Sequence, residues 1–548
     1  MDKIYFNGQI HSLDCSDSVY EAIGIINDKI AALGSNESIL KLQSEHTVLY
    51  DLENNAVYPG FIDSHMHMLE YALQQERVDL SDVKSIDELV LVMKTTLNDQ
   101  SKNRIHHPWL IGRCFNQDNF IDKRIPNKED LNKISTEVPI VIFRVCLHVA
   151  VVNDKALELL FSEDELPNVQ GGEISLDSFG KPNGLLTENA LLLVYDKWEK
   201  PDVSAIKEMI MKASKELASC GITSVHSDDF GSVGNYEDVI TAFSELGNEK
   251  LLNVRVTQQC LIKDNEKLND FIKKGYVLKK VNPYYSLGPL KILSDGSLGA
   301  RTAYLKTAYV DDQSTRGVFV ESKEELLEKM KIANDAGMQI AVHAIGNAAI
   351  ESILDCFKEL ESLNLKKYKS KNFLRHGIVH CQITDTILLN RFKSQEILAY
   401  VQPIFLEYDL HMVEDRVGKE LASTSYAFRT LMDNNVHTSG GSDCPVEHFN
   451  IMNNIYCSVA RKDLYGEPKQ GFYKSESVTM RQALQMFTIE GAYASREEAL
   501  KGSLETGKYA DFVVLDSNLY SVNEDEIRNV KVLLTVMGGE ITYANQKS

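Results

Sequence analysis

Short apolar runs alternate with amphipathic segments through the middle of the chain, and this alternation predicts repeated βα units. Helix-like patterns such as 206–219 and 323–336 lie between many of the runs. The runs that we expect to form strands are Val57–His67, Ile222–Ser227, Leu252–Cys260, Leu290–Ser294, Met338–Ala344, Phe373–Cys381, Leu398–Gln402 and Val436–Gly441. Eight such units predict a TIM-type (β/α)₈ barrel within residues 58–494, and hence an α/β fold class.

Both ends of the chain carry a different pattern, in which short alternating strands are separated by turn residues. Near the N-terminus, Asn7-Gly8 and Asn27-Asp28 fit the turns of β-hairpins. Near the C-terminus the strand-like runs are 510–516, 530–536 and 541–543. We therefore expect residues 1–57 and 495–548 to pair into one small composite β-sandwich.

The segment between the first two predicted barrel strands, about 70–205, is too long for a single crossover helix. It contains strand-like runs at 109–114 and 139–145. We interpret it as a subdomain inserted after strand one of the barrel.

Composition narrows the classes of function. The chain has 548 residues, and its net charge is −21 because 79 acidic side chains outnumber 58 basic ones. This charge argues against nucleic acid or an anionic membrane surface as a partner. The first residues lack a signal-peptide core, and no apolar run reaches the length of a membrane span. Nine scattered cysteines without a CxxC pair indicate a reducing compartment, so we expect a cytoplasmic protein.

Candidate metal ligands recur where the predicted strands end. His65 and His67 are spaced so that an extended strand directs both imidazoles to one face. The other candidates at strand ends are Lys291, His343, His380 and Asp443. Singly, each histidine could be a satisfied core residue and the aspartate could cap a turn. Jointly they fit a metal site better than core packing, because the carboxyl ends of barrel strands meet at one face.

Several of these segments resemble one family of enzymes. Pro59–His67 is similar to the signature of the amidohydrolase superfamily, and Lys291–Ala303 resembles the mark of amidohydrolase family 3, the branch that includes N-substituted formamide deformylases. His343–Asn347, Gly441–Glu447 and 502–516 also match this branch. The resemblance covers nearly the whole chain. It implies a metal-dependent hydrolase barrel combined with a composite β-sandwich.

The resemblance also implies which residues hold metal. It pairs His65 and His67 with Asp443 at one metal, and it assigns His343 and His380 to a second. One or two divalent ions per chain are therefore expected. Zinc is the first choice, and Mn, Fe or Co suits the same donors.

Lys291 matches a lysine that is carboxylated in related proteins and bridges two metals. A free ammonium has no lone pair for a metal, whereas a carbamate offers two anionic oxygens. The alternative is an unmodified Lys291 that pairs with Asp295 or Asp443 beside a single metal.

The implied reaction is hydrolysis of a non-peptide C–N bond, an amide or N-formyl bond, in a small-molecule substrate. Asp443 would accept a proton from metal-activated water and pass it to the leaving amine. One alternative is a deaminase or cyclic amidase that acts on a heterocycle. Another is a non-catalytic scaffold, against which the filled ligand positions argue. Relatives are often homodimers, so a homodimeric state is considered.

Other residues are candidates for holding the substrate: Asn116, Gln117, Asp118, His148, His226 and Arg301. Arg301 could bind a carboxylate or carbonyl of the substrate, or it could form a structural salt bridge with an acidic loop. Asp228 and Asp229 are interpreted as loop carboxylates. Glu447 could bind an amine or begin a helix, where a carboxylate is favourable.

Overall fold

The computed structural model describes residues 1–99, 109–144, 149–161, 166–169, 172–197, 200–233 and 235–545. The chain folds into two compact units, and the second is formed by Glu70–Met209. The first unit combines Met1–Leu69 with Ile210–Ser548. Each unit has its own sheets and its own buried cores.

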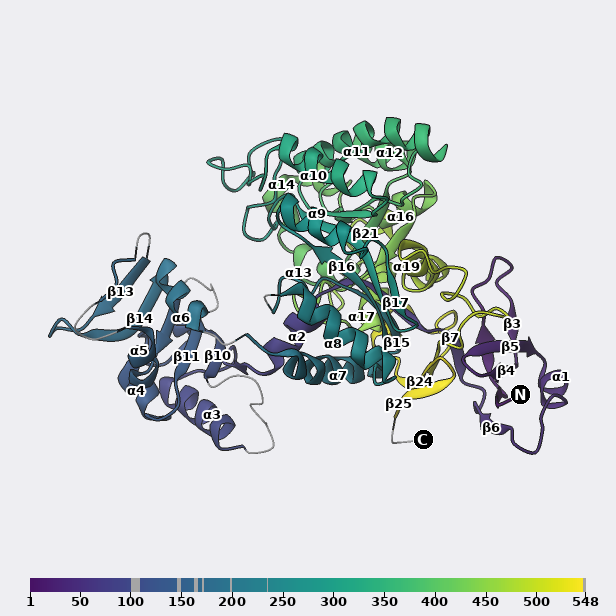
Figure 1. Cartoon of the computed structure of the whole chain (residues 1–548), viewed down its shortest axis with the longest axis horizontal. Coiled ribbons are helices and arrows are strands. Elements are labelled where there is room, and N and C mark those ends of the chain that lie inside the picture. The colour runs from purple at the N-terminus through teal and green to yellow at the C-terminus, as the bar shows by residue number, and fades with distance from the viewer. Residues whose placement is uncertain are drawn as a thin grey trace. The chain divides into compact units, whose positions relative to one another are not determined.

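The first unit contains the predicted barrel (Figure 1). Eight strands follow one another as parallel neighbours. In chain order they are β8 (Phe61–Met66), β15 (Ile222–Ser227), β16 (Arg255–Leu261), β18 (Tyr285–Leu293), β19 (Ile340–Ala344), β20 (Gly377–His380), β21 (Leu398–Val401) and β22 (Thr438–Gly440). The (β/α)₈ barrel is therefore confirmed. A short strand, β17 (Lys280–Asn282), pairs antiparallel with β18.

Amphipathic helices connect the barrel strands, and several begin with side-chain caps. At the start of α10, for example, Ser322 and Glu325 form a capping box. The helices that follow β15 along the chain are α8 (Tyr236–Asn248), α9 (Asn265–Lys273), α10 (Lys323–Asp335), α11 (Asn347–Tyr368), α12 (Thr386–Gln395), α13 (Leu406–Asp409), α14 (Val413–Val417), α15 (Lys419–Ala422), α16 (Phe428–Asp433), α17 (Ile451–Ala460), α18 (Met480–Met486) and α19 (Ile489–Ala494). The two unit boundaries fall in α2 (Met68–Gln75) and at α7 (Val203–Ser219). Among the described residues, no helix is both long and apolar enough to span a bilayer.

The apolar run predicted as the first barrel strand is divided in two. Its first part is β7 (Ala56–Pro59), which lies in a terminal sheet, and its second part is β8 of the barrel. Gly60 separates them at a point of close approach, where a Cβ atom would lie 2.3 Å from the Thr223 side chain. The chain thus passes from one sheet to the other where only a glycine fits.

The terminal strands form two sheets whose facing residues share one core, which includes Tyr5, Ile23, Val57, Phe512 and Val536. One sheet has the order β5-β4-β1-β6 and the other β25-β24-β23-β7-β2-β3, so purple and yellow strands meet in Figure 1. The strands are β1 (Lys3–Phe6), β2 (Gln9–His11), β3 (Val19–Tyr20), β4 (Ala22–Ile26), β5 (Lys29–Gly34), β6 (Val48–Asp51), β23 (Phe512–Leu515), β24 (Val532–Met537) and β25 (Glu540–Ala544), and the short helix α1 (Asn36–Leu40) packs beside them.

The two predicted N-terminal hairpins have different outcomes. The hairpin at Asn27-Asp28 is confirmed, because β4 and β5 pair antiparallel across it. The hairpin at Asn7-Gly8 is wrong, because β1 and β2 belong to different sheets. The chain bends at Asn7-Gly8, and the strands before and after the bend find their partners in different sheets.

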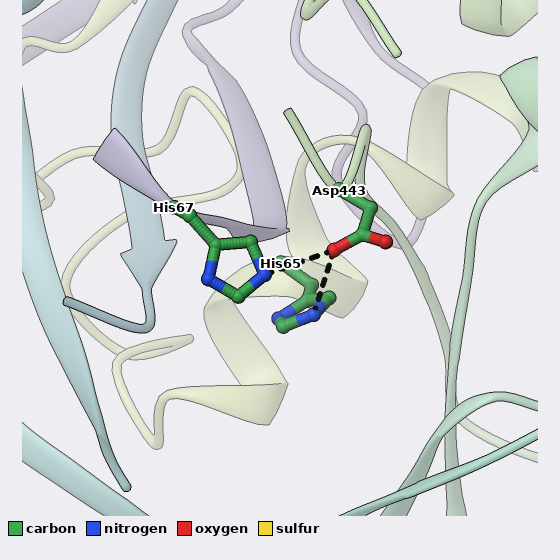
Figure 2. A group of neighbouring side chains, drawn as sticks. All are labelled: His65, His67 and Asp443. Carbon is green, nitrogen blue, oxygen red and sulfur yellow. Dashed lines mark hydrogen bonds and ion pairs between the residues drawn. The ribbon is translucent and has the colours of Figure 1, made fainter. Parts of the chain in front are cut away.

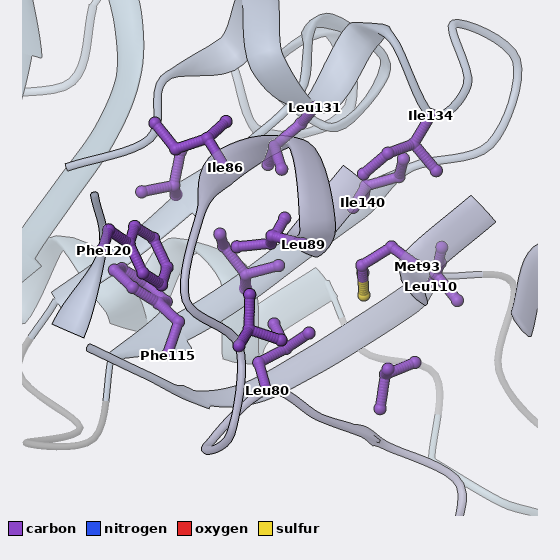
Figure 3. Packing of buried hydrophobic residues seen from close by; sticks show 14 residues of the cluster. Leu80, Ile86, Leu89, Met93, Leu110, Phe115, Phe120, Leu131, Ile134 and Ile140 are labelled. Atoms are coloured by element: carbon purple, nitrogen blue, oxygen red, sulfur yellow. The ribbon is translucent and has the colours of Figure 1, made fainter. Parts of the chain in front are cut away.

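The second unit is built on a sheet with the order β13-β14-β12-β11-β10-β9. Successive residues such as Ile140 and Val141 enter different cores on its two faces. Figure 3 shows the core in which α3 packs through Ile86, Leu89 and Met93. The helices and strands of the second unit are β9 (Val78–Asp79), α3 (Ile86–Asn98), β10 (Leu110–Phe115), α4 (Lys128–Asn132), β11 (Ile140–Arg144), β12 (Val149–Val152), α5 (Asp154–Leu160), β13 (Gly172–Leu176), β14 (Pro182–Glu188) and α6 (Leu192–Lys197).

The barrel closes between its first strand, β8, and its last, β22. The Ser64 hydroxyl donates to the Gly440 carbonyl at 2.7 Å, and the Asp443 amide donates to the His65 carbonyl at 2.8 Å. The His67 amide in turn donates to the Cys444 carbonyl at 2.7 Å. We call this set of contacts the barrel seam.

Asp63, which precedes His65 on β8, strengthens the barrel seam. Its fully buried carboxylate accepts from the Ser442 hydroxyl at 2.6 Å, from the Ser442 amide and from the His65 amide. Gly441 makes the close approach sterically feasible, since a Cβ there would lie 2.6 Å from the His65 nitrogen.

Replacing Gly441 by alanine should force the barrel seam apart. We expect Gly441→Ala to lower the free energy of unfolding by about 1–3 kcal/mol, because backbone atoms cannot move aside as a flexible side chain can. Thermal unfolding followed by circular dichroism measures the change. Gly299→Ala is the control, since the nearest atom to its added Cβ is 3.6 Å away. Equal stability of the two variants would contradict the prediction.

Candidate metal centre

Three predicted ligands converge at the barrel seam. The Nε2 atoms of His65 and His67 both lie 3.1 Å from Oδ1 of Asp443 (Figure 2). One ligand atom from each residue lies within 4.8 Å of the other two, and within the described part of the chain no other trio of His, Cys, Asp or Glu does so. These three residues are therefore arranged to share one cation.

The protonation of His65 follows from its second contact. Its Nδ1 lies 2.7 Å from Oε1 of Gln259, whose Nε2 donates to the Ser64 carbonyl at 3.2 Å. Because the amide oxygen can only accept, His65 carries its proton on Nδ1 and presents a bare Nε2 to Asp443. Burial and the nearby Lys291 lower the pKa of His65 to about 4, so it is neutral at physiological pH.

His67 is held differently. Its Nδ1 lies 2.9 Å from the Asp228 carbonyl, which accepts the Nδ1 proton. Burial lowers the pKa of His67, but the Asp443 carboxylate outweighs burial and raises it to about 9. Without metal, His67 and Asp443 thus form an ion pair. A divalent cation can replace the proton that lies between them.

Lys291 reaches the same centre from β18. Its side chain is 1% exposed, and its Nζ lies 3.3 Å from Nε2 of His65. Its carboxylate partner is Asp228, with Oδ2 3.5 Å away, rather than Asp295 or Asp443. Asp228 lies just past β15, in a loop as expected, and its carboxylate is buried beside Lys291.

The remaining two predicted ligands lie next to each other. The ring centroids of His343 and His380 are 4.4 Å apart, and those of His65 and His380 are 5.5 Å apart. Nδ1 of His380 lies 2.9 Å from Oε1 of Gln402, and Nε2 of His343 lies 3.2 Å from the Gly296 carbonyl. These acceptors leave Nε2 of His380 and Nδ1 of His343 as the unprotonated ring atoms.

Asp295, in the motif after strand four, organises the neighbouring loops. Its two oxygens accept the backbone amides of Ile345, Gly346 and Tyr304 at 2.8–3.0 Å. Oδ1 also lies 3.4 Å from Nε2 of His343. The motif aspartate thus fixes the loop that follows His343 and β19.

The candidate substrate residues of the first unit have other partners. Arg301 forms a two-pronged ion pair with Asp311 at 2.8 and 3.2 Å, which is the structural alternative considered for it. Arg416 also contacts Asp311. His226 is buried on β15, and burial lowers its pKa to about 3. Its Nε2 has no hydrogen-bond partner among the described residues.

The other substrate candidates belong to the second unit. Asn116, Gln117 and Asp118 follow β10, and Oε1 of Gln117 accepts from Arg144 at 2.8 Å. His148 lies outside the described residues. A substrate role for these four residues stays a prediction.

Sequence reasoning missed the residues that orient the ligands, namely Asp63, Gln259 and Gln402. Gln259 lies within the buried barrel strand β16, and Gln402 directly follows β21. A buried amide at such a position is the signal that could have identified them. Together they fit a metal, because the bare Nε2 of His65 and the Asp443 carboxylate oxygen, 3.1 Å apart, both offer lone pairs to a cation.

Comparisons with known proteins agree with this centre. Residues 48–543 match the model of the Amidohydrolase family. YtcJ of Bacillus subtilis (strain 168), an amidohydrolase by name, is 29% identical over 545 residues, which cover 99% of each chain. The N-substituted formamide deformylase of Arthrobacter pascens is 24% identical over 557 residues, which cover 99% of this chain and 98% of that enzyme.

A solved structure is also similar. The crystal structure of an uncharacterized metal-dependent hydrolase from Pyrococcus horikoshii OT3 has a TM-score of 0.78 at 28% identity, and the match covers 95% of this chain and 99% of that one. The resemblance to amidohydrolase family 3 is confirmed. With ligands gathered at the seam of its own barrel, the chain belongs to the amidohydrolase family and is a metal-dependent hydrolase.

Proposed function

We propose that the chain hydrolyses a non-peptide C–N bond, an amide or N-formyl bond, of a small molecule. The observation that carries the proposal is the convergence of His65, His67 and Asp443 beside the buried Lys291. The similarity to a formamide deformylase along nearly the whole chain supports the choice of bond.

The residues of the centre have separate roles in this proposal. A divalent cation, zinc in the first place, would polarise the substrate carbonyl and acidify water. His65 and His67 are held by Gln259 and the Asp228 carbonyl so that their Nε2 atoms face Asp443. Asp443 takes the proton of the attacking water and delivers it to the leaving nitrogen.

Changing Asp443 to asparagine tests the proton transfer. Asp443→Asn keeps an oxygen ligand but cannot accept the proton, so we expect kcat to fall about 10²–10⁴-fold while most of the metal stays bound. Hydrolysis of N-formyl amines and elemental analysis of the same samples measure both quantities. Near-normal turnover would remove Asp443 from the proton path.

Orientation of His65 by Gln259 gives a second prediction. Gln259→Leu removes the acceptor of the Nδ1 proton, so we expect about 10–100-fold weaker zinc binding. Competition with a chromogenic chelator measures the affinity. Gln258→Leu is the matched control, because the neighbouring amide is equally buried but contacts no histidine ligand. An equal loss in both variants would indicate a general packing effect.

We further propose that Lys291 is carboxylated and that the centre then holds two cations, the second at His343 and His380. The short distance from Lys291 to His65 supports this assignment, because a carbamate there would lie among the ligands.

Carbon-13 bicarbonate tests the modification directly. We expect a carbamate signal by NMR and about two metals per chain in the wild type. Lys291→Met should lose the signal and part of the metal, whereas the control Lys329→Met, which alters another buried lysine, should keep both. One metal and no carbamate in the wild type would reject the modification and favour deamination of a heterocycle.

A further inference from the structure

The segment that follows strand β21 contains two carboxylates and begins next to a predicted metal ligand. Gln402, at the end of this strand, contacts Nδ1 of His380, and the Phe405 ring stacks on the His380 ring at 6.0 Å between centroids. Glu407 and Asp409 follow directly in α13. The segment that supports His380 therefore continues directly into these two acids.

The segment that follows strand β22 contains a third carboxylate. Glu447 lies four residues beyond Asp443, after a turn in which the Val446 amide donates to the Asp443 carbonyl at 2.9 Å. Burial raises the pKa of Glu447 to about 7, and the charges of Glu407 and Asp409 contribute to the rise. Helix α17 begins only after Asn450, so Glu447 is not a helix-start residue. We call Glu407, Asp409 and Glu447 the acidic group.

The acidic group lacks a compensating ion pair. None of its carboxylates lies within 4.0 Å of a described Lys, Arg or His nitrogen, and the charges acting on Glu447 are all negative. The positive charges of Arg528 and His411 lower the pKa of Glu407, but both side chains lie beyond ion-pair distance from it. Carboxylates that are partly removed from water and repel one another form a favourable site for a cation.

Gln382, two residues beyond His380, provides an independent observation. This residue is 4% exposed, and its Nε2 donates to Oδ2 of Asp409 at 2.8 Å. Tyr426 also donates to that oxygen, at 2.7 Å. The Oε1 atom of Gln382 is buried without a hydrogen-bond partner among the described residues. A side chain that contacts the acidic group thus carries a buried carbonyl oxygen that lacks a donor among the described residues.

A metal ion does not fit this arrangement. The three carboxylates do not bring one oxygen each within 4.8 Å of the others, as the described ligands at the barrel seam do. An ammonium group on a carbon chain is larger than a bare ion, carries several N–H donors and can contact acceptors that lie further apart.

We propose that the acidic group binds a protonated amine of the substrate, with Glu447 as the main specificity residue. This inference rests on the proposed function and narrows the substrate class to N-formyl or N-acyl amines that carry a second, cationic amino group. The C–N bond would lie at the metal centre, while the ammonium contacts Glu447 and the Asp409–Gln382 pair.

Two probes of equal length test the inference with the zinc-loaded protein. N-formyl diaminobutane carries the second ammonium, and N-pentylformamide replaces it with a methyl group. We expect kcat/KM of the wild type to be at least about tenfold higher for the cationic probe. Glu447→Gln should remove most of this preference by lowering kcat/KM for the cationic probe. Asp415→Asn, which removes an exposed acid in α14, is the charge-matched control and should keep the preference.

Calorimetric binding of diaminobutane separates this inference from the proposed function. Binding that Glu447→Gln weakens about tenfold and Asp415→Asn does not would support the amine site even if neither probe is hydrolysed, in which case only the proposed reaction fails. Equal hydrolysis of both probes, together with no difference in diaminobutane binding between wild type and Glu447→Gln, would overturn the inference.

Discussion

The close approach of β8 and β22 is the constraint on which the functional part of the molecule depends. The first and last strands of the barrel are separated by most of the chain, yet the Asp443 amide reaches the His65 carbonyl and Asp63 binds Ser442. The backbone contacts that close the barrel also bring two imidazoles and a carboxylate to one point. Barrel closure and assembly of the metal centre are therefore one event, and a change that loosens one loosens the other.

Around this seam, each ligand is positioned by a second residue from a neighbouring strand or loop. Gln259 on β16 orients His65, Gln402 after β21 orients His380, and the Gly296 carbonyl after β18 orients His343. These acceptors fix which ring nitrogen is bare before any metal arrives. The segment after β21 that carries Gln402 continues into Glu407 and Asp409, so ligand support and the proposed substrate recognition share one contiguous piece of chain.

The sequence predicted the barrel because buried parallel strands are apolar runs separated by helical periodicity. The sequence did not show that β7 and β8 lie in different sheets, since the partners that separate them are far along the chain. Asn7-Gly8 likewise predicted a turn, but turn chemistry does not say that the following strand joins another sheet. The spacing of His65 and His67 could be interpreted locally. The pairing of Lys291 with Asp228, and of Arg301 with Asp311, required the fold, because both partners are acids among many in the chain.

The order of the ligands along the chain has a consequence for how the protein is made. During synthesis, His65 and His67 leave the ribosome early. Asp443 and strand β23, which pairs with β7, are made only near the end. A nascent chain thus exposes two histidines without the carboxylate that completes their site. Metal selection must wait for the finished polypeptide, and any chain that terminates before Asp443 is released without the means to retain its metal.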